Sequence, residues 1–347
     1  MSRRTYHRSP SQGEATRDPS DVMASASSDP GTPPIVAVHD AQPELIGEPL
    51  ERPPFLTRLV TLIVIVLPLL ALAAAIWMIW DTPSLWLNVG MLLGGYVLTV
   101  LGVTIGYHRL FTHKSFKANP VVTAIIGVLG SMAVQGPILE WVATHRRHHQ
   151  HTDRPDDPHS PHVHGTTFLS LMRGLLHAHF GWFFSKAPTQ DFMRRYVPDL
   201  QADRLVASIS RLFPFWVALG LLIPAGVGYL VTESWVGAFM GLVWGGLLRV
   251  LLVHHITWSV NSVCHLWGQR PFNTHDESRN NPVFGVLALG EGWHNNHHAF
   301  PASAKQGLEW WQIDVSYLII RLLSLVGLVR DIRIPPPERI AAKRRAA

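Results

Sequence analysis

Leu59 to Trp80 reads LVTLIVIVLPLLALAAAIWMIW and contains no charged side chain. A helix needs about 20 consecutive apolar residues to cross the hydrocarbon core of a bilayer, and this stretch is long enough. Leu85 to Tyr107 is again apolar, and Asp81-Thr82-Pro83-Ser84 between the two suits a tight turn. The sequence therefore predicts a hairpin of two membrane-spanning helices.

A second hairpin is predicted farther along the chain. Leu212 to Val231 and Val236 to Val253 are apolar, and Thr232-Glu233-Ser234-Trp235 joins them. The whole chain is 47% hydrophobic and 15% charged, which is too apolar for a soluble domain of this length. We therefore expect an all-α polytopic membrane protein with four transmembrane helices in two hairpins.

Two further apolar segments are expected not to cross the membrane. Val121 to Val134 is short, which favours an interfacial or re-entrant helix. Gly307 to Val329 mixes tryptophan and aliphatic residues with charged residues, a composition that indicates a helix on the membrane surface.

The distribution of positive charge predicts the orientation. The two short connectors contain no Lys or Arg, whereas residues 108–210 and both tails contain many. Because loops rich in Lys and Arg stay on the cytoplasmic side, both termini and the segment between the hairpins should be cytoplasmic. Arg249, near the cytoplasmic end of the last crossing, is expected to snorkel toward that interface.

The two ends of the chain differ from its apolar middle. Residues 1–50 are rich in Pro, Ser, Asp and Ala without apolar periodicity, which predicts a disordered tail. Residues 336–347 form a basic C-terminal tail that includes Lys343-Arg344-Arg345. The excess of basic residues forms no compact patch with interleaved aromatics, so a nucleic-acid partner is not expected. The single cysteine, Cys264, cannot form an internal disulfide.

Histidines are the most unusual feature of the composition, with 20 in the chain. Three short groups contain many of them: HRLFTH at 108–113, HRRHH at 145–149 and HNNHH at 294–298. In the second and third groups the spacing places the rings on one face of a helix. Asn261 and His265 form a further i, i+4 pair after the fourth crossing. The other histidines lack such spacing and are interpreted as structural or surface residues.

The predicted topology brings these groups to one side of the membrane. An even number of crossings precedes each group, so all can converge in a cytoplasmic cap. Imidazole nitrogen is a good ligand for iron, zinc, copper or nickel. A site with this many nitrogens is too large for one tetrahedral ion, and two metal ions are the simpler interpretation.

At these residues the chain resembles the membrane fatty acid desaturases, and among them the stearoyl-type delta-9 enzymes, whose histidine boxes read HRLxxH, HRxHH and HNxHH. The resemblance covers roughly residues 55–335 and gives one desaturase domain over that range. It extends to further short motifs around the boxes: Glu140-Trp141, Asp157-Pro158-His159, Gly181-Trp182, Asn261-Ser262 and Gly290-Glu291-Gly292.

The resemblance implies a di-iron centre and an oxygen-dependent reaction. In this family hydrogen is removed from two adjacent methylenes of an acyl chain, O2 is reduced to water, and a cis double bond remains. Asn261 matches a position that reaches the metal through water. The implied histidine ligands are His108, His113, His145, His148, His149, His265, His294, His297 and His298.

The substrate should occupy a narrow apolar tunnel that admits one carbon pair to the metals. Leu110, Phe111, Trp141 and Trp258 are the candidate lining residues. Animal acyl-CoA enzymes of the family carry an Arg-Asp pair directly before the second box, where this chain has Ala143 and Thr144. The acyl carrier can therefore be coenzyme A or a membrane lipid.

The same resemblance indicates the electron donor and the alternative functions. No HPGG motif of a fused cytochrome b5 follows the third box, so electrons should come from a separate ferredoxin or rubredoxin-like protein. Arg146, Arg147 and the basic tail are the expected docking cations. Asn-Asn in the third box and Ala299-Phe300-Pro301 after it suggest a bacterial protein, hence the inner membrane. A di-iron hydroxylase with the same ligands, or a metal transporter, are the alternatives.

Overall fold

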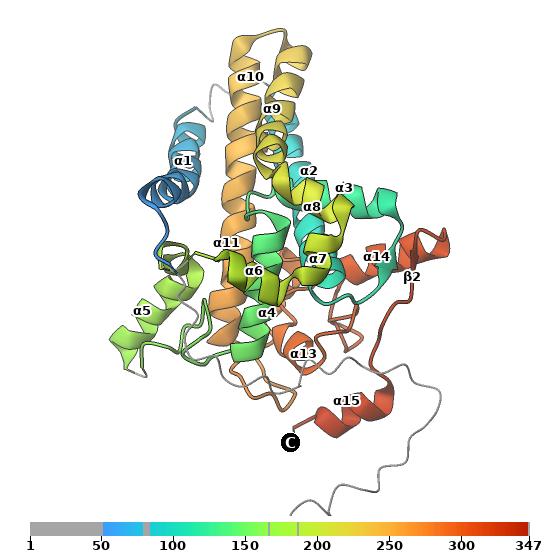
Figure 1. The fold of residues 1–347 in the computed structure, drawn as a ribbon. Helices are drawn as coiled ribbons and strands as arrows, with labels where there is room; N and C mark the ends of the chain where they lie inside the picture. The colour runs from blue at the N-terminus through green and yellow to red at the C-terminus, as the bar shows by residue number, and fades with distance from the viewer. Residues whose placement is uncertain (1–50, 79–83, 166, 186, 346–347) are drawn as a thin grey trace, which may run out of the picture. The chain divides into compact units, whose positions relative to one another are not determined.

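The computed structural model describes residues 51–78, 84–165, 167–185 and 187–345 (Figure 1). This part of the chain is mainly helical, with one two-stranded antiparallel sheet. The predicted tail, residues 1–50, lies outside the described residues, as do residues 79–83 of the first connector.

Within the described residues, four helices are long and apolar enough to cross a membrane, as predicted. Two of them contain π-helical turns, so each is a series of consecutive elements. The four are α1 (Phe55–Met78); α2 (Leu85–Leu101) with η3 (Gly102–Thr112); α9 (Phe213–Thr232); and α10 (Trp235–Gly241) with η5 (Leu242–Leu248), α11 (Arg249–Ser262) and η6 (Val263–His265).

Small residues hold the membrane helices close together. A Cβ atom on Gly228 of α9 would lie 2.1 Å from the carbonyl oxygen of Gly237 on α10, so only glycine permits this approach. Ala71 and Ala75 of α1 pack against η5 in an apolar cluster with Trp244. The hairpin of α9 and α10, and α1 beside it, stand above the helices of the cap in Figure 1.

The last crossing is longer than predicted, because the helix continues from Val253 to His265. The extension contains polar residues that look unsuitable for a membrane, but His254 and Ser262 are buried inside the protein. In Figure 1, α10 and α11 form one continuous helix from the top of the bundle down into the cap.

The predicted snorkelling of Arg249 is wrong. Its side chain is buried, and it donates hydrogen bonds to the carbonyl oxygens of Gly245, Met132 and Gly220 at 3.0, 2.7 and 3.3 Å. Pro224 inside α9 has no N–H to offer the carbonyl of Gly220. The guanidinium therefore satisfies backbone groups that the membrane helices leave unpaired.

The remaining elements form the cap and its connections. Four of the helices begin at ordinary capping residues: the side chains of Asn119, Thr167, Thr189 and Asp203 accept backbone N–H groups of α3, α5, α6 and α8. The elements are α3 (Pro120–Met132), α4 (Ile138–His151), α5 (Phe168–His179), η4 (Gly181–Phe184), α6 (Gln190–Tyr196), α7 (Pro198–Ala202), α8 (Arg204–Arg211), α12 (Pro282–Leu287), α13 (His294–Ala299), α14 (Val315–Leu325), α15 (Pro337–Lys343), β1 (Lys117–Ala118) and β2 (Val329–Arg330).

Near the C-terminus, the predicted surface helix is shorter than expected, and the basic tail contains a helix. The predicted helix over 307–329 is wrong except for Val315–Leu325, because the carboxylate of Asp314 accepts the N–H of Tyr317 and starts the helix there. The basic tail contains α15, whose Ile340 packs near Phe272 and Phe300. The tail is therefore part of the folded cap as far as residue 345.

Candidate metal centre

A π-helical turn positions the first pair of histidines. His108 and His113 are five residues apart, a spacing that an α-helix with 3.6 residues per turn places on different faces. In η3 the N–H of His113 bonds to the carbonyl of His108 at 3.1 Å, the i to i+5 pattern of a π-helix. The two rings therefore lie on one face, with centroids 4.8 Å apart.

The α-helices α4 and α13 supply six more rings, and each helix divides its rings between two places. In α4, His145 and His149 point to one place and His148 to another. In α13 the division is reversed, since the single histidine His297 joins the first pair from α4. With the repeated HxxHH spacing, each of the two helices contributes histidines to both of two neighbouring sites.

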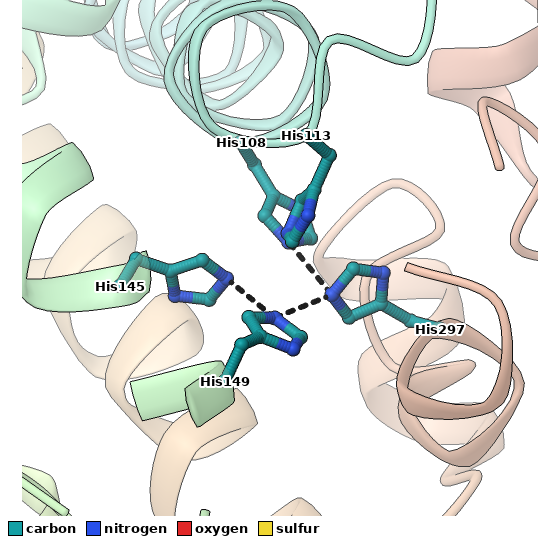
Figure 2. A group of neighbouring side chains, drawn as sticks. All are labelled: His108, His113, His145, His149 and His297. Atoms are coloured by element: carbon teal, nitrogen blue, oxygen red, sulfur yellow. Dashed lines mark hydrogen bonds between the residues drawn. The ribbon is translucent and has the colours of Figure 1, made fainter. Parts of the chain in front are cut away.

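All nine histidines predicted as ligands lie in two clusters, within each of which the candidate ligand atoms are within 4.8 Å of one another. The five-histidine cluster, drawn in Figure 2, joins rings from η3, α4 and α13. Its members are His108, His113, His145, His149 and His297; the four-histidine cluster contains His148, His265, His294 and His298.

Nitrogen atoms face one another across both clusters. In the five-histidine cluster the Nε2 atoms of His108 and His297 are 3.1 Å apart, and those of His297 and His149 are 2.9 Å apart. In the four-histidine cluster the Nε2 atom of His294 lies 3.0 Å from that of His265 and 3.2 Å from that of His298. Convergent imidazole nitrogens of this kind fit a metal ion.

Carboxylates orient four of the nine rings. The Nδ1 atoms of His148, His265 and His298 lie 3.0, 3.0 and 2.9 Å from oxygens of Asp157, Asp153 and Asp276. Glu291 contacts the Nδ1 atom of His108. Because a carboxylate only accepts hydrogen bonds, Nδ1 carries the proton in each pair, and the Nε2 lone pair is left for a metal.

The electrostatics of the five-histidine cluster favour the neutral imidazoles that metals require. Burial, and then the neighbouring histidines, hold the pKa values of His113, His145 and His297 well below the ordinary value. Among the described residues, the buried Nε2 atoms of His113 and His148 have no hydrogen-bond partner. Leaving two buried nitrogens unpaired is costly, and a metal ion is the partner that this donor set fits.

An apolar cavity of about 550 Å³ leads to both clusters. His108, His145 and His294 line one part of it, and Val60 and Val64 of the membrane helix α1 line another. The cavity thus connects the metal ligands with the apolar part of the protein.

Two of the four predicted tunnel residues line this cavity. Trp141 and Trp258 line it, and Trp141 also stacks on His145 with ring centroids 4.9 Å apart. Asn261 lines the cavity as well and belongs to neither histidine cluster. Leu110 and Phe111 are not among the lining residues of this cavity and pack into the hydrophobic core between η3 and its neighbouring helices, and their role in a tunnel stays a prediction.

A family model described as fatty acid desaturase matches residues 83–315. The chain belongs to this family. The match includes α2, the hairpin of α9 and α10, and every histidine of the two clusters, and desaturase-named relatives agree with it. The protein is a fatty acyl desaturase, and the cluster geometry fits its metal site.

The relatives share the family but differ in what their names state. The chain is 40% identical to a hex-5-enoyl-[acyl-carrier protein] acetylenase of Moorena producens, over 81% of this chain and 88% of the relative. It is 37% identical to an icosanoyl-CoA 5-desaturase of Limnanthes douglasii, over 78% and 70%. It is 35% identical to an sn-1 stearoyl-lipid 9-desaturase of Synechocystis sp., over 74% and 76%.

The two arginines expected to attract an electron donor are engaged inside this desaturase. Arg146 forms two hydrogen bonds to the carboxylate of Asp199 at 2.7 and 3.1 Å and also donates to the carbonyl of Phe111. Arg147 pairs with Asp156, and its side chain is 11% exposed. Both guanidinium groups therefore stabilise the cap, and their proposed docking role loses its basis.

The sequence analysis assigned an orienting role to none of the four carboxylates. Asp157 and Glu291 were part of quoted motifs, but Asp153 and Asp276 belong to loops without a recognisable spacing. Asp276 is 22 residues from the histidine that it contacts, and Asp153 is 112 residues from His265. Only a search for acidic residues near each histidine group in the sequence could have suggested Asp153.

Proposed function

We propose that the desaturase holds one iron ion in each histidine cluster, uses O2 as co-substrate and inserts a cis double bond, in our expectation at position 9. The saturated acyl chain is carried by coenzyme A or by a membrane lipid. The observation that carries the proposal is the convergence of nine histidines in two clusters beside an apolar cavity. Asn261, in the cavity wall, joins the centre through water.

Iron supplies the oxidising power that removal of hydrogen from an unactivated C–H bond requires. The protein contributes the position of the substrate. The cavity shields the acyl chain from water, while Trp141 and Trp258 narrow the space next to the rings of His145 and His254. Methylenes beside His108, His145 and His294 are the ones exposed to reaction.

The proposed membrane orientation is based on the charge distribution, and the proposed acyl carriers are based on the relatives. Both termini and the histidine clusters lie on the cytoplasmic side of a bacterial inner membrane, since the connector of α9 and α10 contains no Lys or Arg. Relatives are named for acyl-CoA and for acyl-lipid substrates, which supports either carrier. A separate ferredoxin or rubredoxin-like protein supplies electrons.

The proposal is tested by expressing the wild type and His148→Ala in the same cells and locating double bonds in their fatty acids by mass spectrometry. A monounsaturated acid with the bond at position 9 should appear only with the wild type, together with two iron atoms per purified protein. A hydroxy acid in its place, or a wild-type protein active without iron, would contradict the proposal.

A further inference from the structure

The two histidine clusters differ in the number of carboxylates that contact them. Three rings of the four-histidine cluster, those of His148, His265 and His298, each have an aspartate on Nδ1. In the five-histidine cluster only His108 has a carboxylate partner among the described residues, namely Glu291. The two clusters therefore differ in how many of their histidine rings are held by a carboxylate.

The three aspartates are themselves fixed by hydrogen bonds. Asp153 accepts from the hydroxyl of Ser160 at 2.6 Å and from the backbone N–H of Glu277 at 2.7 Å. Asp157 accepts the backbone N–H of Asp153 at 2.8 Å, and Asp276 accepts that of Ser278 at 3.0 Å. Side chains held from several directions keep the histidine rings in place before a metal arrives.

The three carboxylates are also shielded from solvent. The side chains of Asp157, Asp153 and Asp276 are 0%, 7% and 11% exposed. Water therefore screens their contacts with the histidine rings only weakly.

The carboxylate beside the five-histidine cluster has a different partner. Arg109 is fully buried and places Nη2 3.3 Å from Glu291. The guanidinium also pairs with Asp314, whose Oδ1 atom lies 2.9 Å from Nη1, and it neutralises part of the charge that Glu291 offers to His108. The five-histidine cluster therefore gains less from its carboxylate.

We propose that the four-histidine cluster is the tighter metal site and fills first, and that Asp153, Asp157 and Asp276 are the positioning residues responsible. A carboxylate on the outer nitrogen fixes the tautomer and raises the basicity of the ligating nitrogen, and losing such a partner typically costs about 10–100-fold in metal affinity. The inference rests on the proposed function only in taking both clusters as metal sites. The five-histidine cluster has one more ligand than the four-histidine cluster, but among the described residues only one of its rings has a carboxylate partner.

The experiment is a metal titration of the full-length protein in detergent after removal of bound metal with a chelator. Co²⁺ is the probe, because its visible absorption reports ligand number, and equilibrium dialysis gives the affinity of each equivalent. The wild type should bind two equivalents in separate steps. His298→Ala should abolish the tighter step, whereas His113→Ala should abolish the weaker step and leave the tighter one unchanged.

Carboxylate variants test the cause. Asp276→Asn and Asp153→Asn keep a hydrogen-bond acceptor but remove the charge, so the tighter step should weaken about 10–100-fold while the weaker step stays. Glu291→Gln is the matched control and should leave the tighter step at wild-type affinity. The melting temperature of each metal-free variant shows that it is folded.

Three results would overturn the inference: equal affinities for both equivalents in the wild type, loss of the tighter step in His113→Ala, or a tighter step weakened by Glu291→Gln and not by Asp276→Asn. Two-step binding in a protein that makes no double bond would reject the proposed function alone. One-step binding in an active enzyme would reject this inference alone.

Discussion

Arg249 connects three helices through hydrogen bonds from one buried side chain. Its guanidinium joins α11 to α3 and α9 through carbonyl oxygens, and Gly95 of α2 lies so close that a Cβ atom there would meet the Arg249 side chain at 2.9 Å. A buried cation without a carboxylate in these contacts is unusual. Its role is to satisfy backbone acceptors that neither water nor the helices themselves can reach.

Replacing Arg249 by methionine should therefore destabilise the protein strongly. Each orphaned buried carbonyl costs about 1–3 kcal/mol, and three of them lose a donor. We expect a much lower melting temperature in detergent for Arg249→Met and an intermediate value for Arg249→Lys. Arg321→Met, on the exposed side of α14, is the control. Equal melting temperatures for Arg249→Met and the control would contradict this role.

Among the elements, η3 couples membrane packing to the metal centre. Its first residue, Gly102, touches the backbone of α3, where a Cβ atom would lie 2.1 Å from the nitrogen of Gly130. The same π-helix carries His108 six residues later. The close contact with α3 therefore determines where the first two histidines of the five-histidine cluster stand.

Gly102→Ala should separate η3 from α3 and displace His108. Overpacking of this kind costs about 1–3 kcal/mol, and we expect a lower melting temperature together with loss of metal from the five-histidine cluster. Gly94→Ala in α2 is the matched control, since a Cβ atom there meets nothing within 4 Å. Metal content per protein, measured after purification, distinguishes the two variants. Full occupancy in Gly102→Ala would show that the contact is not required.

The helices themselves were largely predictable, because crossing a bilayer imposes a length and a composition that sequence shows directly. Their ends were less predictable. The last crossing continues to His265 because neighbouring helices bury its polar residues, and the π-helical turns depend on contacts between helices. Local sequence contains neither kind of information.

Across the whole molecule, the cavity connects the membrane helix α1 with the histidines of the cap. Residues from α1, α4 and α11 line it together, and these elements are far apart in the chain. The volume of about 550 Å³ limits how much of an acyl chain fits next to the metal ligands. The preferred chain length is therefore a property of this assembly of elements.

Narrowing the cavity at Val64 should change the substrate preference. Val64→Trp fills space along the α1 wall, so conversion of the longest acyl chains should fall more than conversion of shorter ones. Ile63→Trp is the matched control, because the neighbouring Ile63 is 48% exposed and does not line the cavity. The chain lengths of monounsaturated products in expressing cells report the effect. An unchanged product distribution, with Val64→Trp present at normal levels, would remove this wall from the substrate site.

The four crossings and the nine histidines of the two clusters were predictable from the sequence, since both depend on local composition and spacing. Contacts in the folded protein determine how the rings divide between two clusters, which carboxylates orient them, and that Phe111 packs in the core while Trp141 faces the cavity. These choices depend on contacts between segments such as Asp153 and His265, 112 residues apart. Packing between distant elements sets them, and no periodicity within one element encodes it.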